Sequence, residues 1–383
     1  MKPRELMPSE SLSWYITGLT KPEGTKARLL RSIAESLRAV GDEVEVYVAG
    51  IGLRNSLRIT ARLFRSKADI VLVRFNWALG VSIAAIALIR RARGRRTILH
   101  VPTPIEAVVN EDSPESSRTR VRWKKLLAPF TFQVAAAGAT TVIQNGEGVR
   151  NASPRLKAKT LVIANPSWEI RVGQDNQLPA QSSDALRVVG VSSSGHYHRY
   201  GRFLEGLRIL DGIKGLAERI EVILIGPESA FSREQALMES TELARFSVRL
   251  TGALPEAEAD QIISTALVGL GPLGAGTIRG LKSGSAHRNR TFMRLGVPFV
   301  TDLEDVAFGN QSPDWMLLVE SSDKPLNVMH VLRWRRNLDL ARARTEMRAI
   351  LRRTSVSQFT KQVRSAALSE RDGTVRRRSG RPR

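Results

Sequence analysis

The sequence predicts an α/β protein with two domains, each built on a parallel β-sheet that helices cover. The chain has 383 residues, which exceeds the size at which one hydrophobic core is usual. Short runs rich in Val, Ile and Leu alternate with segments of helical periodicity along most of the chain, a pattern typical of parallel sheets. A polar stretch at 173–184, GQDNQLPAQSSD, interrupts the alternation, which then begins again, so we expect an interdomain linker there.

The first domain is expected to cover residues 1–172. After its first strand, residues 25–40 repeat apolar side chains at every third or fourth position, which predicts an amphipathic helix. Runs of β-branched and aliphatic residues between such segments predict strands. The strands predicted for this domain are 14–18, 44–49, 69–75, 97–101, 140–144 and 160–164.

The second domain is expected to cover residues 185–345 and to show the same alternation. A helical region at 346–370 follows, and the Arg-rich helices from about 326 onward are candidates to cross back to the first domain. Residues 371–383 are strongly basic and are predicted to be disordered. The strands predicted for this domain are 186–192, 220–226, 247–252, 266–271, 297–302 and 315–320.

The net charge of +22 is concentrated in two zones. Residues 51–100 hold 11 Lys and Arg against one Asp, and residues 351–383 hold 10 against two acidic residues. Such zones favour an anionic partner, either membrane lipid, a phosphorylated substrate or nucleic acid, with a solvated face and a charged tail as the plain alternative. Aromatic residues make up 5% of the chain and are not interleaved with the arginines, so nucleic acid is the least favoured partner.

Composition also limits the chemistry and the location. The chain contains no Cys, which excludes disulfides, Cys-ligated zinc and thiol catalysis. The longest apolar run, 77–89, has thirteen residues, well short of the roughly 20 that span a bilayer. The sequence starts without an apolar stretch of signal-peptide length. We therefore expect a cytoplasmic protein, with attachment to the inner face of the membrane as an open alternative.

The segment GLGPLG at 269–274 matches the Gly-x-Gly-x-x-Gly dinucleotide fingerprint, but its context argues against NAD binding. Pro272 lies inside the pattern, no amphipathic helix follows at once, and no acidic residue lies near 20 residues further on. We predict instead a flexible strand-to-helix loop at the mouth of the second domain.

Three junctions between a strand and a helix have the residues to hold an anion. The first, SSSGHYHRYGRFLEGL at 192–207, can present backbone N–H groups at a helix N-terminus. His198 and Arg202 are four positions apart there, on one face if the helix has begun. The histidines raise the question of a metal, but no acidic residue is near them, so no metal is expected.

The other two junctions are HRNRTFMRLGVPFV at 287–300 and GLTKPEGTKARLL at 18–30. In the former, Arg290 and Arg294 share a helical face, and an Arg-rich solvated helix that feeds a buried strand is the plain alternative to a binding site. The latter is a Gly-containing loop after the first strand, and Lys26 begins the helix that follows.

Taken together, these segments resemble the GT-B glycosyltransferases, in particular the retaining family 4 enzymes that build bacterial polysaccharides and glycolipids. In the first half the resemblance rests on EGTKARLLRSIAESLRAVGDEVEVY, ADIVLVRF and RTILHVPTP. In the second half, YHRYGR at 197–202 keeps the His and the final Arg of a Trp-His-Gly-x-Asp-Arg pattern, and HRNRTF at 287–292, before GVP, is similar to Leu-Lys-x-Arg-Glu-Tyr before Gly-x-Pro. The resemblance covers about residues 14–345 and implies two Rossmann-like domains that face a central cleft.

The resemblance also implies roles for residues of the second domain. Arg288 would pair with the diphosphate of the donor, where relatives have Lys. Arg290, or His198 together with Arg202, would complete the anion site. Gly24, in the loop after the first strand of the first domain, would lie opposite this site.

Two further positions concern the reacting sugar and the nucleotide. His100, at the end of a first-domain strand, would lie near the sugar, and a hydrogen-bonded core histidine is the alternative for it. The family usually has Glu where Thr291 stands and often a second Glu where Ser283 stands. Thr291 can accept one hydrogen bond from the ribose, but not in a bidentate, charge-assisted way. Loss of such a charge-assisted hydrogen bond typically costs about 1.5–3 kcal/mol of binding free energy. Weaker donor binding, an altered choice of donor and an inactive homologue are therefore the alternatives.

The function implied is transfer of a sugar from a nucleotide-sugar donor to a polysaccharide or lipid-linked acceptor. The resemblance implies retention of configuration and no metal, and the donor is a substrate rather than a cofactor. The basic zone at 51–100 would suit a lipid-phosphate acceptor or an anionic membrane surface. The alternatives are a non-catalytic GT-B homologue that acts as a binding or assembly subunit, and a nucleic-acid-binding protein.

Overall fold

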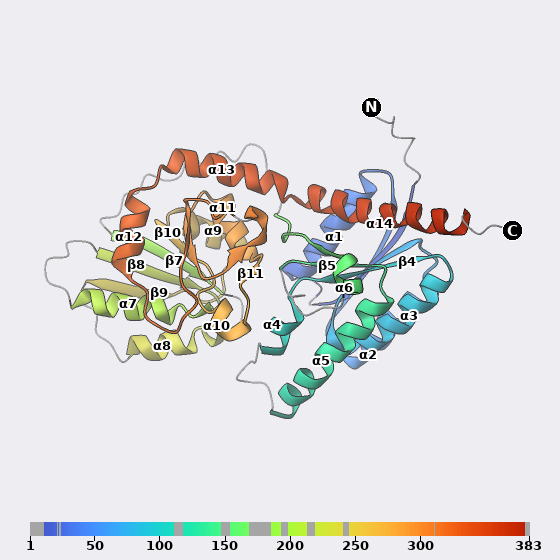
Figure 1. The fold of residues 1–383 in the computed structure, drawn as a ribbon. Helices are drawn as coiled ribbons and strands as arrows, with labels where there is room; N and C mark the ends of the chain where they lie inside the picture. Colours follow the sequence, from blue (N-terminus) through green and yellow to red (C-terminus); the bar gives the residue numbers. More distant parts are fainter. Residues whose placement is uncertain are drawn as a thin grey trace.

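The structure is a computed structural model in which residues 11–20, 22, 24–110, 118–146, 154–167, 185–192, 198–212, 219–239, 245–309 and 311–379 are described. They form two α/β domains side by side, each with a six-stranded parallel sheet between helices (Figure 1). The linker predicted at 173–184 lies outside the described residues.

The sheet of the first domain has the strand order β2-β1-β3-β4-β5-β6. Its inner strands are nearly continuous apolar runs because helices cover both of their faces. All six strands predicted for this domain are confirmed, with ends that differ by one or two residues. They are β1 (Ser13–Leu19), β2 (Glu43–Ala49), β3 (Ile70–Arg74), β4 (Arg96–Val101), β5 (Thr141–Gln144) and β6 (Thr160–Val162).

The sheet of the second domain has the order β14-β12-β10-β7-β8-β9, so the first strand of this domain again lies inside the sheet. The six strands predicted here are also confirmed within two residues at each end. They are β7 (Ala185–Val191), β8 (Arg219–Ile225), β9 (Phe246–Leu250), β10 (Val268–Leu270), β12 (Phe299–Thr301) and β14 (Met316–Leu318).

Helices cover both faces of the first sheet. One face packs against α2 (Leu53–Arg65), α3 (Gly80–Ala92) and α5 (Arg118–Gly138). The other face packs against α1 (Thr25–Arg38) and α14 (Val356–Ser379). The apolar run at 77–89 thus becomes a short 3-10 turn and most of α3, a helix with one buried side.

The second sheet is covered in the same way. The helices α7 (Gly201–Asp211), α8 (Ser232–Glu239) and α12 (Val328–Arg336) lie on one face. The helices α9 (Glu256–Ser264), α11 (His287–Arg294) and α13 (Leu340–Arg353) lie on the other.

The end of the chain returns to the first domain, as the sequence suggested. After α13, helix α14 runs along the first sheet beside α1 (Figure 1), and Phe359 and Val363 join the apolar core there. Arg364 Nε donates to Asp42 Oδ2 at 2.9 Å, and Asp42 is buried. The helix continues to Ser379, past residue 371, where we expected disorder. Arginine has a high helix propensity, so a run of arginines is compatible with a helix.

A short parallel pair, β11 (Ser283–Gly284) with β13 (Glu304–Asp305), was not predicted, because two residues carry no hydrophobic period. It lies at the boundary between the domains: a Cβ on Gly146 would lie 2.9 Å from Ser283 O. The remaining short helices are α4 (Ile105–Asn110), α6 (Pro154–Ala158) and α10 (Ala275–Arg279).

Candidate functional site

Arg288 lies where β7, an inner strand of the second sheet, ends. Its Nη1 donates to the backbone oxygen of Val191, the last residue of β7, and to Tyr200 Oη at 2.9 Å. Both Nη atoms lie 2.7 Å from ring nitrogens of His198. The structure therefore brings His198 and Arg288 together at the carboxyl edge of the sheet, the edge at which ligands of open α/β sheets bind.

The N-terminus of α11 adds further positive potential beside Arg288. Its N-cap is Ala286, which has no side-chain acceptor, and the first turn of the helix contains no acidic residue. Uncapped N–H groups and the helix dipole favour an anion at this position. His287, the first residue of α11, has its pKa lowered to about 4, first by burial and then by four neighbouring cations. These cations are Arg74, Arg290, Lys26 and Arg288.

Two of the four cations, Arg74 and Lys26, come from the first domain. Lys26 is an exposed residue in the first turn of α1, and Gly24 is the N-cap residue of that helix. The carbonyl of Gly24 accepts from Ala27 N at 2.9 Å. Helix α1 contacts the second domain through the ion pair of Arg28 Nη1 with Glu256 Oε2 at 2.8 Å, and the position of Gly24 opposite the donor site stays a prediction.

The start of α7 differs from the anion site expected at 192–207. Gly201 N donates to Glu234 Oε1 at 3.0 Å, so a carboxylate of the protein occupies the first turn of α7. A second anion at this helix start would be repelled by Glu234. Residues 193–197 lie outside the described residues, and the anion-binding role predicted for the backbone of that loop stays a prediction.

Arg202 was predicted as a ligand for the diphosphate, and the structure places its guanidinium elsewhere. Its Nη1 donates to Leu273 O at 2.7 Å, its Nε to Lys324 O at 2.9 Å, and its Nη2 to Glu320 O at 3.1 Å. The side chain is buried, and burial lowers its pKa. Arg202 therefore fastens the loops after β10 and β14 to α7.

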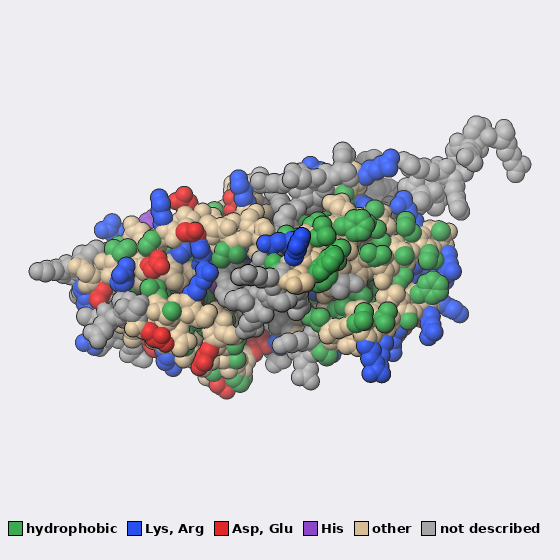
Figure 2. Space-filling view, turned by 90° about the horizontal axis from the view of Figure 1, so that it is seen from below, with side chains coloured by type: hydrophobic (Ala, Val, Ile, Leu, Met, Phe, Trp, Pro, Cys, Tyr) green, Lys and Arg blue, Asp and Glu red, His purple; other side chains and the backbone are tan. Residues whose placement is uncertain are grey.

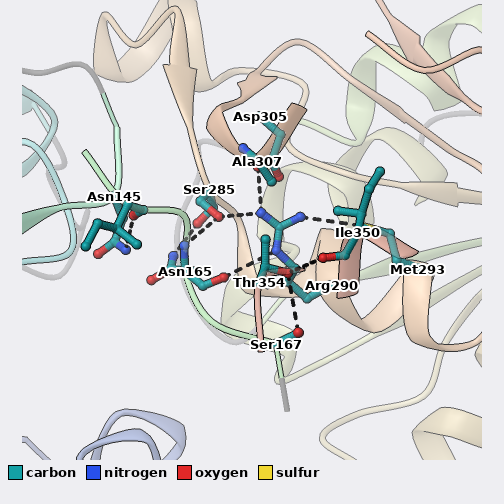
Figure 3. Close-up of polar contacts among 11 residues, drawn as sticks. Asn145, Asn165, Ser167, Ser285, Arg290, Met293, Asp305, Ala307, Ile350 and Thr354 are labelled. Carbon is teal, nitrogen blue, oxygen red and sulfur yellow. Dashed lines mark hydrogen bonds and ion pairs between the residues drawn. The ribbon is translucent and has the colours of Figure 1, made fainter. Parts of the chain in front are cut away.

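Arg290 was also predicted to contact the anion, and it lies instead in a buried network at the domain boundary (Figure 3). Its Nη2 donates to Asp305 Oδ1 at 2.6 Å and to Ser285 Oγ at 2.8 Å. Its Nε lies 3.4 Å from the backbone oxygen of Asn165, a residue of the first domain, whose own N–H donates to Ser285 Oγ at 2.9 Å. Arg290 thus connects the two domains and is balanced by a carboxylate.

Thr291 and Ser283, the two positions at which the resemblance led us to look for Glu, occupy different surroundings. Thr291 is half-buried in the middle of α11. Ser283 is buried in β11, beside Gly146 of the first domain.

The segment 269–274 begins inside β10 and leads directly into α10, a helix of five residues. We expected a strand-to-helix loop here, and we did not expect a helix to follow at once. Asp302 caps α10, because its carboxylate accepts from Ala275 N at 3.1 Å and Gly276 N at 3.2 Å. Burial raises the pKa of Asp302. The helix start that a dinucleotide phosphate would need is thus already occupied by a carboxylate.

His100 is fully buried in the first domain, which corresponds to the core histidine that we considered as the alternative. Its Nε2 lies 3.1 Å from Asn145 Oδ1, and its ring packs 5.8 Å from that of Phe359 in α14. Burial and the charge of Arg74 lower its pKa to about 3, so the ring is neutral at pH 7. The role near the reacting sugar that the resemblance implies for His100 stays a prediction.

The sequence analysis missed Arg74 as a candidate. It ends β3, and the residue is buried, with 7% of its surface exposed. The signal was present in DIVLVRF, because a charged residue inside a strand buried on both faces is rare without a partner.

Metal-binding clusters and membrane-spanning helices are both absent from the part of the chain that the structure describes. Within that part, no group of three His, Asp or Glu side chains is placed to hold a metal ion. Among the described helices, none combines the length and apolar character needed to cross a membrane.

Comparisons with known proteins agree with this architecture. No protein-family model matches the sequence, and no curated protein has a similar sequence. Solved structures are similar over nearly the whole chain. HepE from Anabaena, in complex with UDP and glucose, matches with a TM-score of 0.61 and 14% identity over 94% of this chain and 100% of its own.

Two further structures show the same similarity. The lipopolysaccharide outer core galactosyltransferase WaaB has a TM-score of 0.61 and 12% identity, over 94% of this chain and 99% of its own. A trehalose-6-phosphate protein from E. coli bound to UDP-2-fluoro glucose has a TM-score of 0.62 and 12% identity, over 93% of this chain and 98% of its own. The chain therefore has the GT-B fold, as the sequence predicted.

Proposed function

We propose that the protein transfers a sugar from a nucleotide-sugar donor to a polysaccharide or lipid-linked acceptor. The observation that carries the proposal is the position of Arg288, which is held beside His198 at the end of β7 and next to the uncapped start of α11. This arrangement suits a diphosphate, which is doubly anionic and needs fixed donors at the carboxyl edge of the sheet.

In this proposal Arg288 stabilises the nucleoside diphosphate as it leaves the sugar. Negative charge develops on the leaving phosphate oxygen, and a guanidinium already held in place stabilises it without reorganisation. Val191 O, Tyr200 Oη and the His198 ring hold Arg288 before the ligand arrives. Charge neutralisation by Arg288 and the helix start would replace a metal. Retention of configuration is proposed from the family resemblance.

The acceptor side is proposed to include a membrane surface. A set of large apolar residues on α2, α3 and α5, together with one residue just before α2, is more than half exposed, and we call it the apolar face. Its members are Ile51, Leu53, Leu57, Phe64, Val81, Leu88, Trp123, Leu126 and Phe130. Figure 2 shows hydrophobic side chains gathered over the first domain with Lys and Arg at their margin, while the acidic side chains in this view lie on the other domain.

The combination of exposed apolar side chains with Lys and Arg at their margin suits an anionic bilayer better than a soluble polymer. Exposed apolar side chains at such density usually mark an interaction surface. Arginines on α2, among them Arg54, Arg58 and Arg65, are exposed beside them. Each cation close to an anionic membrane contributes about 1 kcal/mol. A lipid-linked acceptor presented at the membrane would thus be brought to the first domain.

A non-catalytic GT-B homologue is the second candidate, and Thr291 favours it. A threonine in the middle of α11 cannot form the bidentate contact with ribose hydroxyls that a glutamate forms. Such a protein would bind an acceptor or a partner without turning over a donor.

The test is a calorimetric titration with a panel of nucleoside diphosphates and sugar nucleotides in metal-free buffer. UDP is the first probe, because the complexes of HepE and of the E. coli protein contain UDP or a UDP sugar. We expect micromolar affinity for one donor and a loss of at least tenfold in Arg288→Ala. Arg208→Ala, an exposed arginine on α7, is the matched control and should bind as the wild type does.

The outcomes separate the two candidates. Donor binding followed by slow release of free sugar, lost in Arg288→Ala, supports the transferase. Donor binding without any turnover supports the non-catalytic homologue. A wild-type protein that binds none of the panel contradicts the proposed donor site.

A further inference from the structure

A cavity of about 550 Å³ lies in the second domain where α12 meets α13, on the side away from the first domain (Figure 1). Two hydrogen bonds show which edge of the sheet this is. Trp334 Nε1 donates to the backbone oxygen of Asp314, just before β14, at 2.7 Å. Arg335 Nε donates to the backbone oxygen of Leu267, just before β10, at 2.9 Å. The cavity therefore lies at the amino edge of the second sheet, whereas the proposed donor site lies at the carboxyl edge.

An indole and several planar polar side chains line this cavity. Trp334 is half-buried, and it packs against the hydrophobic core of the domain as well as lining the cavity. On α12 and its C-cap, three exposed residues follow one another at spacings of three and four, so they share one face of the helix. The exposed polar residues that line the cavity here are Asp314, His330, Arg333 and Asn337. The cavity thus presents an aromatic ring beside a carboxylate, an imidazole, a guanidinium and a carboxamide.

Hydrogen bonds within the wall of the cavity hold its shape. Trp315 is buried, and its Nε1 donates to Glu346 Oε2 at 3.1 Å, while Glu346 Oε1 accepts from Arg342 Nε at 2.9 Å. Asp339 caps α13 by accepting from Arg342 N at 3.0 Å. The indole of Trp334 is fixed by its own hydrogen bond to the segment before β14. A site whose walls are held in place before the ligand arrives loses less conformational entropy on binding. Its volume lies within the roughly 300–1,000 Å³ that is usual for ligand pockets.

The charges of the cavity argue against an anionic ligand. The carboxylates of Asp314, Asp339 and Glu346 line it together with the guanidinium groups of Arg333 and Arg342, and Arg342 is already paired with Glu346. A phosphate group would therefore meet more negative than positive charge. A neutral sugar suits the same walls, because each hydroxyl both donates to a carboxylate and accepts from a guanidinium. The apolar C–H face of a sugar ring can pack on the indole.

We propose that this cavity is a second carbohydrate-binding site, which holds sugar units of the acceptor chain away from the reaction site. The inference rests on the proposed function for the acceptor being a sugar chain. Ligands that react in open α/β sheets bind at the carboxyl edge, so a site at the amino edge takes no part in the transfer itself. A chain held at this second site stays near the protein, which raises its local concentration at the cleft.

The experiment measures the binding of neutral oligosaccharides in the absence of a donor. The probes are oligosaccharide fragments of glucans, galactans, mannans and chitin, titrated by calorimetry. We expect at least one probe to bind the wild type, with affinity at least tenfold lower in the double variant Asp314→Ala with Asn337→Ala. Both residues are exposed, so the melting temperature should not change. The double variant Glu258→Ala with Gln261→Ala, which removes an exposed carboxylate and an exposed carboxamide from α9, is the matched control and should bind as the wild type does.

Trp334→Ala tests the aromatic wall. Its affinity for the same probe should also fall at least tenfold, but its melting temperature should fall as well, because Trp334 packs against the core. The exposed double variant therefore decides the result. A wild-type protein that binds none of the probes overturns the proposal. So does a double variant Asp314→Ala with Asn337→Ala that binds the probe with the affinity and stoichiometry of the wild type.

Failure of the proposed function and failure of this second site give different results. If the wild type binds no nucleotide but binds an oligosaccharide that the double variant does not bind, the transferase proposal fails while the carbohydrate site is established. If the wild type transfers sugar, loss of the second site should raise KM for long acceptors several-fold and leave kcat and the KM for short acceptors unchanged. An unchanged KM for long acceptors in the double variant would contradict the role in holding the acceptor chain.

Discussion

Arg290 and Asp305 form an ion pair inside the boundary between the two domains, with Nη2 and Oδ1 2.6 Å apart and the side chains 3% and 0% exposed. The same guanidinium contacts Ser285 Oγ and the backbone oxygen of Asn165 (Figure 3). An arginine that the sequence suggested as a ligand for phosphate is thus part of the structure that joins the domains.

Removal of one partner should destabilise the protein strongly. Arg290→Ala leaves Asp305 buried without its counter-ion, and such a change typically costs about 3–5 kcal/mol. Urea denaturation of the wild type and the variant measures the difference. The double variant Arg290→Met with Asp305→Leu leaves no charge of this pair behind. Its free energy of unfolding should therefore fall less than that of Arg290→Ala. Equal losses in the two variants would contradict a buried, coupled pair.

Arg202 should behave as a structural residue rather than as a donor ligand. Arg202→Ala removes the hydrogen bonds to Leu273 O, Lys324 O and Glu320 O and leaves these carbonyls without their donor. The hydrogen bond to Leu273 O is buried, and a buried acceptor left unsatisfied costs about 1–3 kcal/mol. We expect a clear fall in the free energy of unfolding, whereas the UDP affinity of the folded protein should change less than in Arg288→Ala. If Arg202→Ala lost tenfold in UDP affinity while its free energy of unfolding stayed unchanged, Arg202 would be a donor ligand after all.

His100 should make the protein less stable in mild acid. Its pKa is about 3 in the folded protein, whereas the ordinary pKa of a histidine is 6.5, so below pH 6.5 the unfolded chain binds the proton more tightly. From pH 7 to pH 5 this lowers the free energy of unfolding by about 2 kcal/mol. His287, with a pKa of about 4, acts in the same direction.

The check is urea denaturation at both pH values for the wild type and for His100→Gln. The variant cannot take up this proton in its unfolded state, so its loss of stability between pH 7 and pH 5 should be smaller by about 2 kcal/mol. An identical loss in both proteins would show that His100 titrates normally in the folded state.

The apolar face should bind anionic vesicles. Leu53 is 79% and Leu57 62% exposed, so Leu53→Ser with Leu57→Ser should change stability little. Full burial of a leucine side chain contributes about 2 kcal/mol, so we expect vesicle affinity to fall at least tenfold. Ile209→Ser, which replaces an exposed residue of α7 in the second domain, is the matched control.

Co-sedimentation with phosphatidylglycerol-containing vesicles and with pure phosphatidylcholine vesicles measures the effect. Binding of the wild type to the anionic vesicles in preference to the neutral ones, lost in the double variant and kept in Ile209→Ser, supports a membrane contact at the apolar face. Binding that the double variant retains would place the contact elsewhere.

The sequence predicts the strands well because strands buried on both faces are short, continuous apolar runs. This applies to β3 and β8 alike, whose residues are nearly all buried. The pair β11 and β13 escaped prediction since two residues cannot show a period. The return of α14 to the first sheet could be suggested from composition, but its contact with α1 depends on the packing of Phe359 and Val363.

Site residues were harder to assign, because the role of an arginine depends on partners far away in the sequence. Arg288 and Arg290 are two positions apart in one helix, yet the former lies at the end of β7 and the latter pairs with Asp305. Arg202 is occupied by carbonyls about 70 and 120 residues further along the chain. Local spacing contains no information on such partners, because only the fold brings them together.

The most direct test of a diphosphate site at Arg288 is a crystal structure of the protein grown with UDP. We predict that the diphosphate lies between the end of β7 and the start of α11, with phosphate oxygens about 3 Å from the Arg288 guanidinium. UDP bound at another place, with Arg288 still directed at Val191 O and His198, would contradict the account.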